Sequence, residues 1–258
     1  MTTYQFVINS RFTGMNGLDS DVHEALTQWG IGHSMKMIEF HFSKAFNPAD
    51  SQRFIDDFFN DEDVRANFLL PDISGMSTRP LPTRGKARFS LMHVQSTHLE
   101  GLMPAVSERF ISGSSFKGRP PYKPQHLDIS IDFEIDEALF DPESTLYQLL
   151  SEDWRSDLLC ALFSVLRAGG ALNQQSSTVE PYLTVTQKLY KILVEPVRLE
   201  TEDKLTLSHI YCYRILSLGD IDFFPENPDT DLHPGNRCFL VINTLRRHVT
   251  LFYNAVYV

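Results

Sequence analysis

Six acidic or imidazole side chains gather in one short segment, residues 219–236, which also contains three prolines. Carboxylate oxygens are the ligands that calcium prefers, so this composition makes a calcium-like site conceivable. The spacing departs from the EF-hand pattern, and the prolines favour an irregular, solvated loop instead. The segment reads GDIDFFPENPDTDLHPGN, and its candidate ligands are Asp220, Asp222, Glu226, Asp229, Asp231 and His233.

A second segment, residues 113–118 (GSSFKG), superficially resembles a phosphate-binding loop. It lacks the Gly-Lys-Ser/Thr ending that such loops need. Arg119-Pro120-Pro121 follows it, and consecutive prolines cannot open the helix that normally receives the phosphate. We therefore expect no phosphate binding in this loop.

Motifs for nucleophilic catalysis, dinucleotide binding and metal hydrolysis are missing from the sequence: there is no GxSxG, no GxGxxG after a strand and no HExxH. Cys160, Cys212 and Cys238 are too few and too scattered for a disulfide framework or a zinc site. We expect a non-enzymatic protein with no catalytic residue, no cofactor and no metal.

One alternative stays open, namely a small intracellular enzyme or ligand-binding protein with an unrecognised pocket. His209, His233 and His248 could serve such a pocket, because imidazoles act as acids, bases and ligands near neutral pH. This alternative predicts that the three histidines and the acidic loop converge in one cleft.

Basic residues concentrate in residues 79–123, where eight Lys or Arg face only two Glu. This tract overlaps two Pro/Gly-rich loops, 71–86 and 113–125, and exposed loops carry recognition more often than packed elements do. The pattern predicts a docking surface, although a solvated loop that offsets the acidic residues 134–157 fits equally well. The residues proposed to bind a partner here are Arg84, Lys86, Lys117 and Arg119.

The whole chain has 258 residues, a net charge of −10 and 42% hydrophobic residues, which is typical of a globular protein. The acidic balance argues against nucleic acid and anionic membranes as partners. No apolar run is long enough to span a bilayer, and the few cysteines fit a reducing compartment. We expect one compact domain over residues 1–258, with two lobes, 1–133 and 134–258, as the alternative division.

Strands are predicted where apolar and polar residues alternate. In residues 36–42, Ile38, Phe40 and Phe42 fall on one face, which predicts a strand with that single face on the core. Residues 127–133 give the clearest alternation in the chain. The other predicted strands are 4–9, 87–94, 205–216, 237–243 and 248–258, and the last two are close enough to pair as a hairpin across 244–247.

Helices are predicted over 18–29, from Asn47-Pro48 to residue 60, over 152–168 and over 179–194. Ser151 is the expected cap of the third, and Gly169-Gly170 its stop. Strands and helices do not alternate regularly. The predicted fold class is therefore α+β: a mixed, mostly antiparallel sheet packed with several helices, ending in a C-terminal β-hairpin.

Three blocks in order carry a resemblance to a known family. Residues 158–194 combine a helix, a Gly-Gly-Ala-Leu break and a helix that starts at Pro181-Tyr182-Leu183. Residues 40–64 are a Phe-rich segment with Phe58-Phe59, and residues 239–253 place basic residues between two apolar strands. In these blocks the chain resembles the cilia- and flagella-associated protein 300 family, whereas residues 71–126 depart from it.

The resemblance implies a non-enzymatic factor for motile cilia. It implies a role in cytoplasmic preassembly of axonemal dynein arms and in their delivery by intraflagellar transport. The implied partners are other dynein assembly factors, axonemal dynein subunits and the intraflagellar transport machinery. The implied location is the cytoplasm and the motile cilium or flagellum, at the axoneme. It supplies no catalytic residues.

Arg246, Arg247 and His248 stand at the predicted hairpin tip. Charges are easily solvated at such a turn, which is one interpretation of the cluster. The other is an anchor for an acidic surface of a partner protein, because arginine is enriched among the residues that dominate protein interfaces.

Overall fold

The structure is a computed structural model. It describes residues 3–14, 17–71, 78–81, 85–94, 136, 138–150, 152–170, 174, 176, 180–198, 205–219, 224 and 232–256. The predicted strand 127–133 and the predicted cap Ser151 lie outside these residues.

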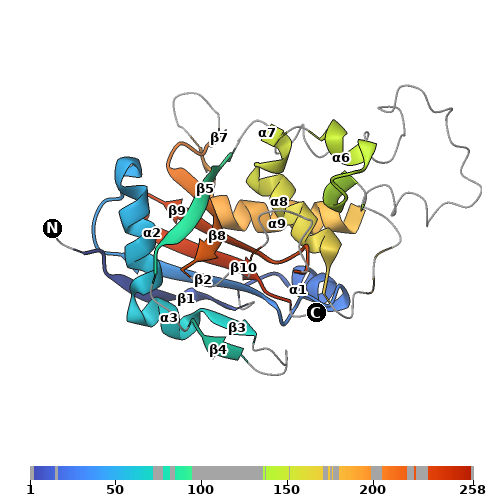
Figure 1. Ribbon diagram of the computed structural model, residues 1–258. Coiled ribbons are helices and arrows are strands. Elements are labelled where there is room, and N and C mark those ends of the chain that lie inside the picture. Colours follow the sequence, from blue (N-terminus) through green and yellow to red (C-terminus); the bar gives the residue numbers. More distant parts are fainter. Residues whose placement is uncertain are drawn as a thin grey trace, which may run out of the picture.

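A six-stranded antiparallel sheet forms the centre of the molecule, in the order β1-β2-β10-β9-β8-β5 (Figure 1). Its strands are β1 (Phe6–Gly14), β2 (Met35–Phe42), β5 (Ala87–Met92), β8 (Ile210–Leu218), β9 (Arg237–Asn243) and β10 (His248–Asn254). Two small ribbons accompany it, β3 (Leu69–Pro71) with β4 (Thr78–Pro80) and β6 (Val197–Arg198) with β7 (Leu205–Thr206). The predicted α+β class, the antiparallel sheet and the C-terminal hairpin, which is β9–β10, are all confirmed.

Helices cover both faces of the sheet (Figure 1). One face packs against α1 (Ser20–Gln28), α8 (Leu158–Ala168) and α9 (Glu180–Val194). The other packs against α2 (Ser51–Asn60) and α3 (Glu62–Asn67), and Phe58 of α2 meets Phe6 of β1 and Phe40 of β2 edge to face. The shorter helices α6 (Thr145–Leu149) and α7 (Glu152–Arg155) lie beside α8.

The prediction that β2 has only one face on the core is wrong. Ile38, Phe40 and Phe42 do face α2, but Met37 and Glu39 on the opposite face are buried as well. The reason is position, because β2 is an interior strand between β1 and β10 and lies under helices on both sides.

Two predicted elements are divided in the structure. The helix over 152–168 breaks at Asp157, whose carboxylate accepts a hydrogen bond from Leu159 N at 2.8 Å and so caps α8. The strand over 205–216 breaks at residues 207–209, which turn the chain from β7 into β8. The helix predicted at Asn47-Pro48 starts as a 3-10 turn, Pro48–Asp50, in which Asn47 accepts from Ala49 N, and continues as α2.

The predicted stop after α8 is confirmed and has a tertiary role. Gly169 adopts φ 65°, a left-handed conformation that glycine tolerates best. Gly170 then donates its N–H to Trp29 O at 2.9 Å, at the end of α1. The approach is so close that a Cβ on Gly170 would lie 2.1 Å from Gly30 O.

The first half of the chain contributes β1, β2 and β5 to the sheet, and the second half contributes β8, β9 and β10. Strand β10 therefore lies between a strand of each half. In the part of the chain that the structure describes, no helix is long and apolar enough to cross a membrane.

Candidate interaction site at the hairpin tip

The turn between β9 and β10 presents one apolar and two basic side chains to solvent. Leu245 is 65% exposed, and Arg246 and Arg247 are exposed beside it. Arg247 has φ 53°, a left-handed backbone that tight turns between strands use. The two arginines therefore lie where the sequence predicts them, at an exposed tip.

Hydrogen bonds on both flanks hold this turn. Asn243 Oδ1 accepts from Arg246 N at 3.0 Å, and Thr244 donates through both N and Oγ1 to His209 O at 3.0 Å. Phe42 N donates to Arg247 O at 3.0 Å. A turn fixed by β2 and by the turn before β8 presents its side chains with little conformational freedom left to lose on binding.

Glu195 stands behind the tip and joins three of its side chains. Its carboxylate accepts from Arg246 Nη1 at 3.0 Å and from Asn243 Nδ2 at 3.2 Å, and it lies 3.3 Å from His248 Nε2. Glu195 directly follows α9 and adopts φ 40°. A left-handed backbone at a non-glycine residue carries strain, which the surrounding contacts must hold in place.

His248 is not exposed with the arginines, so its predicted place on a binding surface is wrong. Its side chain is buried, with Nδ1 3.7 Å from Glu39 Oε2 and Nε2 next to Glu195. Glu39 is itself only 1% exposed and accepts a hydrogen bond from Asn9. The register explains this, because His248 is the first residue of β10 and its side chain points to the face that α9 covers.

The histidines do not form a common cleft. His209 lies near Glu195 and Arg246, and burial lowers the pKa of its imidazole. His233 instead accepts from Gly235 N at 3.1 Å, before the start of β9. His248 stands past the other end of β9, about 20 Å away for a seven-residue strand. Among the described residues, the three histidines therefore do not converge as a shared pocket would require. Most of the acidic loop 219–236 lies outside the described residues.

The remaining basic candidates are only partly described. Lys86 is exposed just before β5, whereas Arg84, Lys117 and Arg119 lie outside the described residues.

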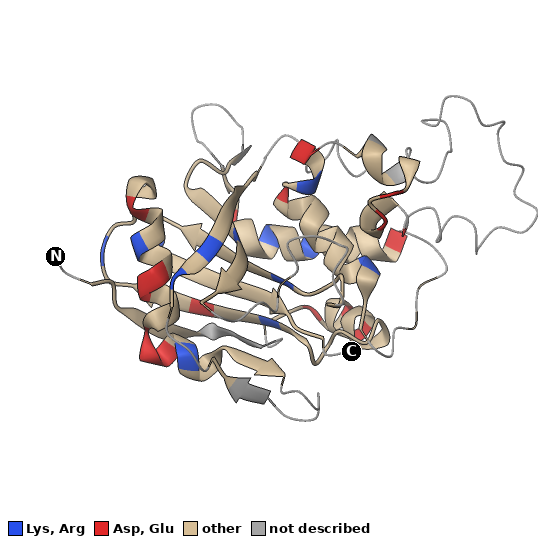
Figure 2. Ribbon diagram, in the orientation of Figure 1, with Lys and Arg blue, Asp and Glu red and all other residues tan. Residues whose placement is uncertain are grey.

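Acidic residues gather on α2 and α3 (Figure 2). Several of them have structural roles: Asp56 accepts from Ala87 N, and Asp61 caps α3. No three His, Cys, Asp or Glu side chains in the described ranges are placed to hold a metal ion.

Sequence reasoning missed Glu39 and Glu195, the two carboxylates that organise this site. A signal existed for Glu39, because it is an acidic residue inside a strand whose other positions are mostly apolar. Glu195 carried no comparable signal, since an acidic residue after a helix is ordinarily solvated.

A family model described as cilia- and flagella-associated protein 300 matches residues 2–254. The chain belongs to the cilia- and flagella-associated protein 300 family. Its match extends from β1 to the end of β10 and so includes the hairpin tip and Glu195. The family is associated with cilia and flagella, which implies a ciliary or flagellar location for its members.

Two relatives carry the family's name. The cilia- and flagella-associated protein 300 of Paramecium tetraurelia is 27% identical over 236 residues, which cover 92% of this chain and 88% of that protein. The protein of the same name from Chlamydomonas reinhardtii is 24% identical over 249 residues, which cover 92% of each chain. No solved structure matches this chain.

Proposed function

We propose that this chain is a non-enzymatic binding factor that supports cytoplasmic preassembly of axonemal dynein arms. It also supports their delivery into the cilium by intraflagellar transport, and ciliary motility depends on it. The observation that carries the proposal is membership, over residues 2–254, of a family associated with cilia and flagella. Its partners are other dynein assembly factors, axonemal dynein subunits and the intraflagellar transport machinery, met in the cytoplasm and at the axoneme.

The mechanism is stoichiometric binding: the factor holds a dynein subunit or an assembly partner and releases it at the axoneme. The hairpin tip supports this mode of action. It combines an exposed leucine, Leu245, with two arginines on a turn that hydrogen bonds keep rigid. Such a tip suits an acidic partner surface with an apolar centre.

The first experiment deletes the gene in a ciliated or flagellated cell and examines axonemes by electron microscopy. We expect missing dynein arms and immotile cilia, while arm subunits accumulate in the cytoplasm. Normal arms on every axoneme of the deletion strain would contradict the proposed function.

The second experiment returns tagged variants to the deletion strain. Arg247→Glu reverses one exposed charge at the tip, and Lys191→Glu reverses one at an exposed position of α9, one helical turn before Glu195 and outside the turn between β9 and β10. We expect Arg247→Glu to reduce recovery of dynein subunits and assembly factors at least fivefold by quantitative mass spectrometry, and Lys191→Glu to retain them. Equal recovery for the two variants would remove the tip from the mechanism, and the deletion result would still decide the function.

A further inference from the structure

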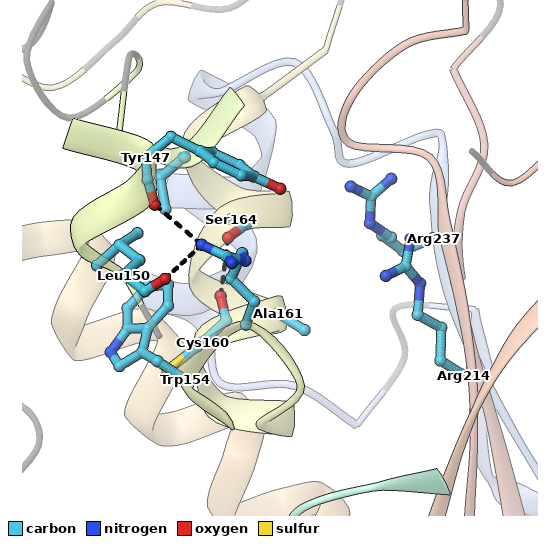
Figure 3. A pocket seen from close by; sticks show the side chains of 10 residues that line it. Tyr147, Leu150, Trp154, Cys160, Ala161, Ser164, Arg214 and Arg237 are labelled. Carbon is cyan, nitrogen blue, oxygen red and sulfur yellow. Dashed lines mark hydrogen bonds between the residues drawn. The ribbon is translucent and has the colours of Figure 1, made fainter. Parts of the chain in front are cut away.

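A small cavity lies between the sheet and the helices α6, α7 and α8 (Figure 3). Its volume is about 80 Å³, several times what one water molecule needs, but far below the ~300 Å³ of the smallest typical ligand pockets. It therefore has room for one small polar group and not for a whole cofactor. Three arginines line it: Arg155, Arg214 and Arg237.

Arg214 and Arg237 reach the cavity from the same face of the sheet. Arg214 of β8 pairs with Phe239 of β9, and Arg237 lies two residues before Phe239, so the two side chains are diagonal neighbours. Both point across the cavity toward Tyr147 and Ser164 on the helical side (Figure 3). Burial and the neighbouring charge of Arg214 lower the pKa of Arg237 to about 9, whereas Tyr147 opposes the shift.

No acidic residue stands among the described residues that line the cavity. The guanidinium of Arg237 donates from Nη1 to Asn236 O at 2.9 Å, which occupies one of its five N–H groups. Cys160 also lines the cavity, but burial raises the pKa of its thiol, so the sulfur supplies no negative charge.

Two neighbouring arginines, the buried Arg167 and the half-buried Arg155, show how the chain satisfies a guanidinium in this region. Arg167 is 1% exposed and forms a fork with Asp136, through Nε–Oδ1 at 2.9 Å and Nη2–Oδ2 at 3.2 Å. Arg155 stacks on Tyr147, with its guanidinium 4.4 Å from the ring centre, and donates to the carbonyls of Tyr147 and Leu150 (Figure 3). No carboxylate among the described residues that line the cavity forms an equivalent pair with the half-buried Arg237, although cations largely removed from water are normally paired.

We propose that this cavity binds a phosphate group, held by Arg214 and Arg237 and by the phenol of Tyr147. A guanidinium presents a planar fork of N–H donors that matches two phosphate oxygens, and two adjacent forks suit a dianion. The group comes either from a free phosphate compound or from a phosphorylated side chain of a partner protein. This proposal does not depend on the hairpin tip or on the role in dynein arm assembly.

The experiment uses the purified full chain and inorganic phosphate as the probe, with sodium chloride adjusted to keep the ionic strength constant. Trp154 lines the cavity, whereas Trp29, the other tryptophan, is fully buried elsewhere, so tryptophan fluorescence reports on the site. We expect a saturable fluorescence change and a rise in melting temperature with phosphate and neither with chloride. Trp154→Phe should abolish the fluorescence change and keep the thermal shift.

Three variants assign the effect to the cavity. Arg237→Gln should weaken phosphate binding at least tenfold, and Arg237→Lys, which keeps the charge but loses the fork, should weaken it less. Lys86→Gln removes one exposed positive charge outside the cavity and should bind within twofold of the parent chain. Circular dichroism checks that each variant is folded, and Arg237→Lys serves as the test if Arg237→Gln is not.

Two further ligands separate the sources of the phosphate. A phosphoserine peptide that binds at least tenfold more tightly than inorganic phosphate assigns the site to a partner's side chain, and the reverse order assigns it to a free phosphate compound. The unphosphorylated peptide is the control. Equal responses to phosphate and chloride, or equal phosphate affinity in the parent chain and in folded Arg237 variants, would overturn the proposal.

Discussion

His248 lies between two acidic side chains that come from distant parts of the chain, Glu39 in β2 and Glu195 after α9. Replacing His248 by alanine would remove one polar neighbour from each of these two buried carboxylates. A hydrogen bond to a charged group contributes about 1.5–3 kcal/mol, so we expect His248→Ala to lower the free energy of unfolding by about 3 kcal/mol. Urea denaturation followed by circular dichroism measures this.

His41 provides the control for that substitution, because it pairs directly with His248 across β2 and β10 but is exposed. His41→Ala should change the free energy of unfolding by less than about 0.5 kcal/mol, as exposed substitutions usually do. Similar losses in the two variants would mean that the carboxylates do not depend on His248.

His209 gives the molecule a pH dependence with a definite sign. Burial lowers the pKa of this imidazole, Arg246 lowers it further, and Glu195 opposes both. The folded chain therefore resists protonation, whereas the unfolded chain takes up a proton near pH ~6.5. The stability contributed by neutral His209 is complete above that pH and is lost as the pH falls toward the lowered pKa of the folded state.

We expect His209→Leu to lose less stability than the parent chain between pH 7 and pH 5, by at most about 2 kcal/mol. Among the described residues, neither ring nitrogen of His209 has a partner at good hydrogen-bond geometry, so an apolar replacement should be about as stable at pH 7. Denaturation curves at several pH values measure the slope, with exposed His23→Leu as the control. If His209→Leu loses more stability than the parent chain between pH 7 and pH 5, the predicted sign of the pH dependence is wrong.

At the residue scale, sequence reasoning located the exposed arginines and misplaced the histidine beside them. Turn residues such as Arg246 and Arg247 depend on local chain geometry, which the spacing of β9 and β10 already fixes. The burial of His248 depends on Glu39 and Glu195, which only the folded sheet and α9 bring together. Arg214 and Arg237 were missed for the same reason, because strand pairing makes them neighbours.

At the scale of elements, most helices and strands followed from periodicity, and the errors occurred where tertiary contacts interrupt a pattern. The helix over 152–168 has a continuous apolar stripe, yet it breaks at Asp157, where the backbone of His93 bonds Ser156 and Leu158. Strand β2 looked one-sided because Glu39 is polar, although the polar network at the hairpin tip accommodates it in the interior. The alternation of apolar and polar residues along a strand gives the residue types on each face, but it does not show whether one or both faces of the sheet are covered by helices.

The contact between the ends of α1 and α8 gives a prediction at this scale. Gly170→Ala would place its Cβ against the carbonyl of Gly30, so the two helices must separate. We expect a loss of about 3 kcal/mol, at the upper end of overpacking costs. Thermal denaturation measures it.

Gly32→Ala is the matched control for that substitution. The nearest atom to its added Cβ is the hydroxyl of Thr27 at 3.2 Å, at the end of a small side chain that can shift. It should cost less than about 1 kcal/mol. Equal melting temperatures for Gly170→Ala and Gly32→Ala would mean that the helix ends move apart freely.

For the whole molecule, the central sheet combines strands of both halves, with β10 between β2 and β9. We predict that fragments 1–133 and 134–258, expressed separately, do not fold, and that the full chain unfolds in one cooperative transition. Each fragment would expose a strand edge and an apolar face that the other normally covers. Circular dichroism and calorimetry test this, and a folded fragment with its own melting transition would favour two lobes.

The place of β10 has a consequence for biosynthesis. Strand β2 ends at residue 42, but its neighbour β10 starts only at residue 248, so the ribosome must translate about 200 further residues before the two can meet. At ~5–20 residues per second, the nascent chain waits ten seconds or more with one edge of this aromatic-rich strand unpaired. Chaperones that shield this strand during translation would therefore govern the yield of native protein.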